Sequence, residues 1–165
     1  MAIEVQVRKA RLNDAEVIAK FVNSARTEAE MITRLDVAER FSQVGFILAE
    51  YHNEAVGLVG FQVENLVIRV TDFLIAPAID RVVAGKALIA AMERAGEDLQ
   101  AEACVLFLPP HPSQELVSYW ELFEYDRKPV SKLPRAWREA SNEWSSNATE
   151  VMIKQLREDM TRKPM

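Results

Sequence analysis

The chain has 165 residues, a formal net charge of −5 and 49% hydrophobic residues, which is enough for one domain with a sizeable core. The negative charge argues against a general nucleic-acid-binding protein, and no uncharged apolar run is long enough to span a bilayer. The first residues carry no signal-peptide pattern, and one cysteine permits no intramolecular disulfide. We therefore expect one domain over residues 1–165, in the cytoplasm, with no nucleic-acid or membrane partner.

The first third of the sequence combines one strand pattern with two helical patterns. Residues 5–10 alternate like an edge strand. Asn13 and Glu16 have the spacing of a capping box, so we expect a helix to begin here. The side chains expected to face inward on this helix are Val17, Ile18, Phe21 and Val22. A second helix is expected over residues 34–43.

The central part of the sequence predicts three consecutive strands and a helix. Residues 46–50 and 55–63 form a hairpin that turns at residues 52–54, where the chain reads His-Asn-Glu. Asn65 then turns the chain into a strand over residues 66–76. The residues expected on the buried face of the following helix are Leu88, Met92, Ala95 and Leu99, which recur at intervals of four, three and four.

The last third of the sequence predicts a further strand, a helix and a closing strand pair. Residues 104–108 form an apolar strand in which Cys104 is expected to be a packed core thiol. A helix is expected over 114–124, and residues 125–130 and 151–156 should pair antiparallel. Together these patterns predict an α/β domain with a mixed, mostly antiparallel sheet of six or seven strands flanked by helices.

The segment over residues 73–89, FLIAPAIDRVVAGKALI, predicts an anion site. An apolar strand ends at Pro77, which cannot donate to a sheet ladder, and a polar turn follows at Asp80 and Arg81. The helix is expected to begin around residues 83–85. A strand that feeds a helix through a compact loop directs backbone N–H groups and the positive end of the helix dipole at one point, which suits a pyrophosphate.

This segment resembles the acetyl-CoA loop of the GNAT superfamily of N-acetyltransferases, in which a strand with Val-x-Pro precedes Arg/Gln-x-x-Gly-x-Gly/Ala. Residues 75–77 (Ile-Ala-Pro) and 85–89 (Gly-Lys-Ala-Leu-Ile) match in register. Residues 8–14, 56–61 and 151–156 also resemble the opening, a central strand and the last strand of the family, so the likeness covers roughly residues 3–156. The resemblance implies a GNAT-like fold and direct transfer from acetyl-CoA, or another acyl-CoA, to a small-molecule amine or a peptide N-group.

The cofactor loop departs from the family pattern at two positions. Asp80 stands where the family has Arg or Gln, and it brings a negative charge toward a pyrophosphate. Val83 stands where the family has the first loop glycine. A valine Cβ crowds the approach to phosphate and makes positive φ costly. The residues that the resemblance assigns to the cofactor are Leu74, Ile75, Arg81, Val82, Val83, Ala84, Gly85 and Lys86. A GNAT-fold module that has lost transfer and keeps a CoA-binding, regulatory or partner-binding role is therefore the alternative.

The catalytic positions of the family are also altered. Its thiolate-protonating tyrosine falls on Trp120, and indole has no acidic O–H, so Tyr119 is the candidate acid, with a packed aromatic as the alternative. Its catalytic glutamate falls on Arg69, and the nearest carboxylates are Glu64 and Asp72. We take Asp72 as the candidate base, direct or through water, with ion pairing or solvent exposure as the alternative.

Other polar and aromatic features have weaker functional interpretations. His111 follows a strand where a pantetheine arm would run, whereas His52 is expected to decorate a surface turn. Two histidines and one cysteine, scattered, make no metal site. A basic segment over residues 127–138 is either a solvated loop or a contact for an anionic group. Trp137 and Trp144, seven apart on an expected helix over 134–144, suggest a homodimer contact or a lid, unless both pack on the sheet.

Overall fold

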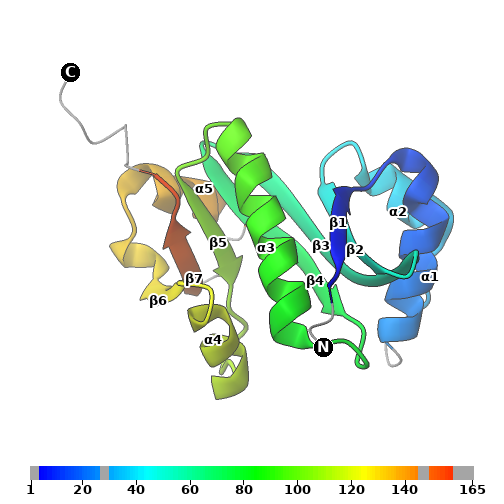
Figure 1. Ribbon diagram of the computed structural model, residues 1–165. Helices are drawn as coiled ribbons and strands as arrows, with labels where there is room; N and C mark the ends of the chain where they lie inside the picture. The colour runs from blue at the N-terminus through cyan, green and yellow to red at the C-terminus, as the bar shows by residue number, and fades with distance from the viewer. Residues whose placement is uncertain (1–3, 27–29, 145–148, 158–165) are drawn as a thin grey trace. The chain divides into compact units, whose positions relative to one another are not determined.

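The computed structural model describes residues 4–26, 30–144 and 149–157, without the side chains of Glu143 and Trp144. Its strands form one mixed sheet of seven strands in the order β1-β2-β3-β4-β5-β7-β6 (Figure 1). The strands β4 and β5 run parallel, and β1–β2, β2–β3, β5–β7 and β6–β7 are antiparallel. This confirms the predicted mixed, mostly antiparallel sheet.

The chain forms two compact units, the first within residues 1–62 and 71–92 and the second within residues 63–70 and 93–165. The elements of the first are β1 (Gln6–Lys9), α1 (Ala15–Ala25), α2 (Arg34–Arg40), β2 (Gly45–Tyr51) and most of β3 (Glu54–Glu64). Those of the second are β5 (Ala103–Phe107), α4 (Gln114–Glu121), β6 (Asp126–Pro129), α5 (Arg135–Trp144) and β7 (Glu150–Gln155). Two elements, β4 (Val67–Ile75) and α3 (Arg81–Asp98), contribute to both units.

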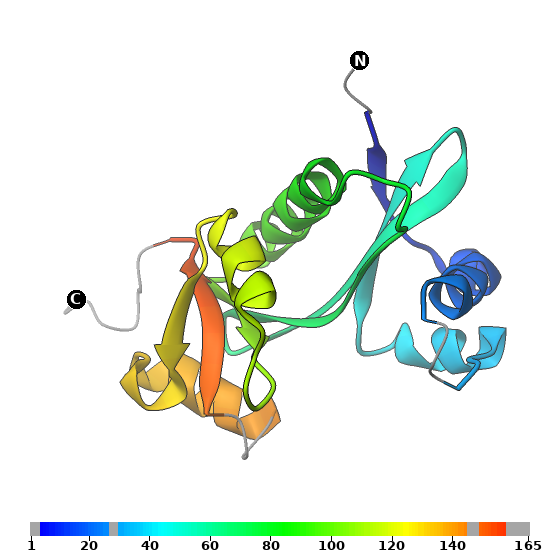
Figure 2. The same ribbon diagram turned by 90° about the horizontal axis from the view of Figure 1, so that it is seen from below.

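In the first unit, α1 and α2 cover one face of the strands β2 and β3 (Figure 2). Ile18 and Phe21 of α1 are buried in one cluster with Phe46 of β2 and Leu58 of β3, and Val37 of α2 joins it. The hairpin between β2 and β3 turns at His52 and Asn53 with φ of 50° and 65°, as the polar turn residues predict.

The start of α1 differs from the prediction. A short 3₁₀ helix over Leu12–Asp14 precedes α1, and the carboxylate that accepts the Arg11 N–H belongs to Asp14. Arg8 donates two hydrogen bonds of 2.9 Å to that carboxylate and holds its pKa at about 2. The capping box of Asn13 and Glu16 is therefore wrong. Val17 is also 42% exposed, because α1 buries Ala15, Ile18 and Ala19 instead.

In the second unit, α5 packs on β5 and β7. The strand residues Val105 and Ile153 are buried in one cluster with Trp137 of α5. The Trp137 indole Nε1 donates to the carboxylate of Glu102 at 3.2 Å, and both residues are buried. Cys104 is fully buried, as predicted, and burial raises the pKa of its thiol to about 12.

The helix α3 begins at Arg81, before the predicted start, and ends at Asp98. Its residues Leu88, Met92 and Ala95 are buried, as the periodicity predicts. Leu99 is 60% exposed, so its placement on the buried face is wrong. The reason is that Gln100 takes a φ of 66°, which turns the chain away from the helix just after Leu99.

Candidate functional site

The loop between β4 and α3 has the strand–turn–helix geometry that the sequence predicts, and all of it lies in the first unit. The Ala76 N–H donates to the Val56 carbonyl at 2.8 Å, which holds the end of β4 against β3. The Ile79 N–H donates to the Ala76 carbonyl at 3.0 Å and closes a turn. The chain then enters α3 at Arg81.

Asp80 caps the N-terminus of α3. One carboxylate oxygen, Oδ1, accepts from the Val82 N–H at 2.9 Å and from the Val83 N–H at 3.1 Å. These are two of the backbone donors that the resemblance assigns to a pyrophosphate. Sequence reasoning treated Asp80 only as an unfavourable charge and missed its cap, although aspartate immediately before a helix is a common N-cap.

The other loop residues differ in exposure. Ala84 and Gly85 are buried, whereas the side chains of Arg81, Val82 and Lys86 are exposed. Val83 is also exposed and does not take a positive φ, because it lies inside α3, so the expected conformational cost of valine does not arise. Leu74 and Ile75 of β4 are half-buried, and Leu74 packs against the core cluster under α1 and α2.

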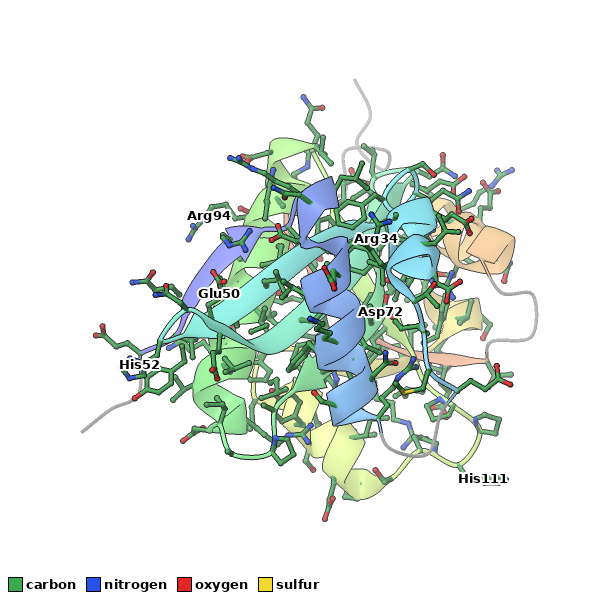
Figure 3. The ribbon with its side chains drawn as sticks, turned by 90° about the vertical axis from the view of Figure 1, so that its right-hand side faces the viewer. Arg34, Glu50, His52, Asp72, Arg94 and His111 are labelled. Atoms are coloured by element: carbon green, nitrogen blue, oxygen red, sulfur yellow. The ribbon has the colours of Figure 1, made fainter. Side chains whose placement is uncertain are left out.

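Asp72, the candidate base, lies on β4 beside α1 and α2 (Figure 3). Its Oδ2 accepts from Arg40 Nη2 at 2.6 Å and from Thr71 Oγ1 at 2.7 Å, and its Oδ1 accepts from Arg40 Nη1 at 3.1 Å. The ion-pair alternative raised by the sequence is therefore what the structure shows. The three hydrogen bonds tie this carboxylate to Arg40 and Thr71, which favours a role in positioning Arg40.

Glycine at position 60 of β3 makes room for this arrangement. A Cβ there would lie 2.6 Å from Asp72 Oδ2 and 2.8 Å from Thr71 Oγ1. Consecutive side chains of a regular strand point to opposite faces, yet both of these oxygens face Gly60. The strand β4 is therefore irregular at Thr71 and Asp72, which is a feature that sheets often show beside functional sites.

A pocket of about 100 Å³ opens beside Asp72 within the first unit. Its apolar wall includes Ile18, Val22, Phe46 and Leu58, and its charged groups are Arg26, Asp36, Arg40 and Asp72. The Asp36 carboxylate also accepts from the Thr33 N–H at 2.8 Å, because Asp36 and Thr33 form the capping box of α2. Sequence reasoning missed the pocket and Arg40, since Arg40 is 32 residues away from Asp72 in the chain.

Tyr119, the candidate acid, lies on α4 in the second unit. Its ring is half-buried and makes edge contacts with Phe123 at 5.1 Å and Trp120 at 6.4 Å between centroids. Trp120 is 2% exposed and packs edge-on against Tyr125, so it is a core residue. The Tyr125 hydroxyl donates to Glu93 at 2.8 Å, and burial raises the pKa of this phenol well above its ordinary value.

The other polar residues named from the sequence, His52, His111 and Arg69, do not line the pocket beside Asp72. His52 is exposed at the tip of the β2–β3 hairpin, apart from Asp72 in the same unit (Figure 3). His111 is exposed in the second unit, with a φ of 53°. The Arg69 guanidinium stacks over the Phe107 ring at 5.0 Å. Among residues 4–26, 30–144 and 149–157, no group of three metal-ligating side chains could hold a metal ion.

Comparison with known proteins identifies the fold. No protein-family model and no curated protein matches the sequence. Many solved structures match, among them three that match over most of both chains. The PaiA N-acetyltransferase from Thermoplasma acidophilum with coenzyme A matches with a TM-score of 0.63 and 12% identity, over 93% of this chain and 99% of that chain. A GNAT superfamily phosphinothricin acetyltransferase from Sinorhizobium meliloti with acetyl-CoA matches with a TM-score of 0.68 and 12% identity, over 99% of this chain and 94% of that chain. Aminoglycoside 6′-acetyltransferase type Ii matches with a TM-score of 0.69 and 11% identity, over 93% of this chain and 99% of that chain. The chain therefore has the GNAT fold, as its motifs predicted.

Proposed function

We propose that this chain is an N-acyltransferase that uses acetyl-CoA, or another acyl-CoA, to acylate a small-molecule amine or a peptide N-group. In this reaction the amine nitrogen forms a bond to the thioester carbonyl carbon, the C–S bond breaks, the thiolate gains a proton and the amine nitrogen loses one. The observation that carries the proposal is the β4–α3 loop within a GNAT fold. Solved structures of the same fold contain coenzyme A or acetyl-CoA.

The backbone of this loop fits an anionic group. The N–H groups of Val82 and Val83 already converge on a single carboxylate oxygen of Asp80. A phosphate oxygen could take the same two donors if the Asp80 side chain turned away. The small, buried Ala84 and Gly85 follow directly on the helix, and Arg81 and Lys86 supply positive charge at its start. Leu74 and Ile75 of β4 would line the approach to the thioester.

Asp72 and Tyr119 stay proposals as the base and the acid. Asp72 keeps about one acceptor position beside its bonds to Arg40 and Thr71. Tyr119 carries the hydroxyl nearest in sequence to the position of Trp120. Replacing Tyr119 with Phe should lower kcat about tenfold or more, with little change in KM, if its hydroxyl protonates the thiolate. An unchanged kcat would remove Tyr119 from the site. Placing the two reactants in contact could then account for most of the rate.

Titration calorimetry with acetyl-CoA and with free CoA tests the proposal directly. We expect heat from both ligands at or below millimolar concentration, and Gly85→Val should abolish it by filling the space beside the loop backbone. Ala95→Val is the control, because it also adds a β-branched side chain at a buried position of the same helix, ten residues beyond Gly85 and away from the loop. Circular dichroism should show that both variants stay folded. No heat from the wild-type protein would contradict the proposal.

A GNAT-fold module that has lost transfer is the second candidate. Two observations favour it: the Asp80 carboxylate occupies the donors of the loop, and Trp120 is buried where the family has a tyrosine. Such a module would either bind CoA without acetylating any amine, or bind neither CoA nor acetyl-CoA. A coupled assay for released CoA, run with an amine panel, separates this candidate from the transferase.

Three further properties belong to the proposal. We place the protein in the cytoplasm, with no nucleic-acid or membrane partner. In the described residues, no helix is long and apolar enough to cross a bilayer. A homodimer also stays a prediction, but Trp137 gives it no support because this side chain is 5% exposed. The side chain of Trp144 lies outside what the structure describes. Light scattering at tens of micromolar would measure the assembly.

A further inference from the structure

We infer that the pocket beside Asp72 takes an acceptor that carries its own carboxylate, held by Arg40, and a small aliphatic side chain. A small aliphatic α-amino acid has this chemistry. The inference rests on the proposed function, since it names the acceptor class of that transferase. It starts from the hydrogen-bonding capacity of the two charged groups at the mouth of the pocket.

The Asp72 carboxylate has little capacity left for a ligand. A carboxylate offers about four lone-pair positions, and Asp72 already accepts two hydrogen bonds from Arg40 and one from Thr71. Gly60 packs so closely on Oδ2 that an added Cβ would lie 2.6 Å away. An ammonium group would have to displace Arg40 in order to pair fully with this carboxylate. Asp72 is therefore the group that holds Arg40.

Arg40, in contrast, retains donors. A guanidinium carries five N–H groups, and among residues 4–26, 30–144 and 149–157 the two hydrogen bonds to Asp72 leave about three for another partner. The side chain is 42% exposed, and its guanidinium lies 5.2 Å from the centroid of the Phe46 ring, which fixes its plane. A planar, oriented guanidinium is the side chain best suited to a carboxylate. Arg26 adds a second positive charge to the same pocket.

The rest of the pocket sets the size and polarity of the acceptor. Its volume of about 100 Å³ is about two thirds of that of a cavity that holds a benzene ring, roughly 150 Å³, so it suits a side chain of about three or four carbon atoms. Ile18, Val22 and Leu58 give it an aliphatic wall. The other carboxylate, Asp36, is engaged by the Thr33 N–H at the start of α2. The pocket therefore combines one oriented cation with space for a propyl- or butyl-sized group.

The test uses four related compounds: L-leucine, L-leucinamide, isopentylamine and 4-methylpentanoate. Binding to the full chain is followed by NMR saturation transfer with and without free CoA, and acetylation by release of CoA from acetyl-CoA. We expect L-leucine to bind at least tenfold more tightly than leucinamide or isopentylamine, and 4-methylpentanoate to bind measurably. Equal binding of leucine and isopentylamine would overturn the inference.

Variants assign the effect to Arg40. Arg40→Gln should weaken leucine binding tenfold or more and leave isopentylamine unchanged, and Arg34→Gln, at the other end of α2 and outside the pocket, should change neither. If Arg40→Gln fails to fold, Arg40→Lys keeps the charge and should still weaken leucine selectively. Asp72→Asn should weaken leucine binding as well, because it releases Arg40 from its fixed position, and should leave isopentylamine binding unchanged. A loss of isopentylamine binding would show that Asp72 binds the ammonium, and the inference would fall.

The two proposals can fail separately. If acetyl-CoA produces no heat but leucine binds in an Arg40-dependent manner, the transferase is refuted and the pocket assignment stands. If acetyl-CoA binds and is used with an amine that lacks a carboxylate, the transferase stands and the acceptor class is wrong.

Discussion

The cap on α3 allows a quantitative prediction about cofactor affinity. Asp80→Asn removes one negative charge but keeps a side chain that caps helices about equally well. We expect this variant to bind acetyl-CoA more tightly than the wild type, while its stability changes by less than about 0.5 kcal/mol. Asp80→Ala removes the cap as well and should cost about 1 kcal/mol of unfolding free energy.

The size of the gain follows from two contributions. A phosphate oxygen that takes the donors 2.9 and 3.1 Å from Asp80 Oδ1 must first displace the carboxylate, which forfeits its attraction to the helix dipole, about 0.5 kcal/mol. If the displaced carboxylate then lies about 7 Å from two phosphate charges in water, the repulsion is about 1.2 kcal/mol. The sum, about 1.7 kcal/mol, corresponds to a roughly 15-fold lower Kd for Asp80→Asn.

Calorimetry at low and high salt measures this gain. At an ionic strength near 0.5 M the repulsion is largely screened, so the advantage should fall to about threefold or less. Asp98→Asn is the control, because it removes the same charge at the far end of α3, about 27 Å away along an ideal helix. If Asp80→Asn binds acetyl-CoA no more tightly than the wild type at low salt, the loop donors do not hold the pyrophosphate and the argument is refuted.

Three further predictions concern stability and can be checked by urea unfolding. Gly60→Ala should cost about 1–3 kcal/mol, because the new Cβ would meet oxygens of Thr71 and Asp72 at 2.8 and 2.6 Å; an unchanged midpoint would contradict the crowding. Asp14→Asn should cost about 1–2 kcal/mol near pH 6, since Arg8 lowers the pKa of Asp14 from 3.8 to about 2. That difference is complete above about pH 4 and should shrink as the pH falls towards 2; a pH-independent difference would exclude this cause. Tyr125→Phe should cost about 1–3 kcal/mol by leaving Glu93 short of a donor, and no loss would show that Lys154 satisfies Glu93 alone.

Elements with strong local patterns could be predicted from the sequence. The hairpin at His52 and Asn53 follows from turn chemistry, and the apolar strand of Cys104 follows from its run of hydrophobic residues. The errors lie at helix ends, where a local signal competes with a tertiary contact. Asn13 has the sequence of a cap, but Arg8 on β1 fixes Asp14 and moves the start of α1.

The candidate site also has features that follow from local sequence and features that depend on the fold. The position of the loop after β4 is a local property and was predicted. The cap by Asp80 is also local, but the family pattern drew attention to the charge of this residue instead of its hydrogen-bonding geometry. The pair of Arg40 and Asp72 joins α2 to β4 across 32 residues, and nothing in the spacing of either segment indicates the other. Pockets that depend on such pairs require the fold.

Asp72 and Asp80 each accept hydrogen bonds from donors that a ligand could use, at two places in the first unit. Each carboxylate satisfies donors that would otherwise be left for a ligand, namely the Arg40 guanidinium and the α3 N-terminus. They differ in how easily a ligand can compete. Asp80 makes two bonds through one oxygen at an exposed helix end, so a phosphate that takes its place must displace it and lose affinity. In the part of the chain that the structure describes, Asp72 leaves about three N–H groups of Arg40 unused, so a carboxylate can bind beside it. Removing the charge of Asp80 should therefore strengthen cofactor binding, because the carboxylate no longer competes with phosphate for the donors of α3. At Asp72, binding of an acceptor carboxylate should depend on the guanidinium of Arg40.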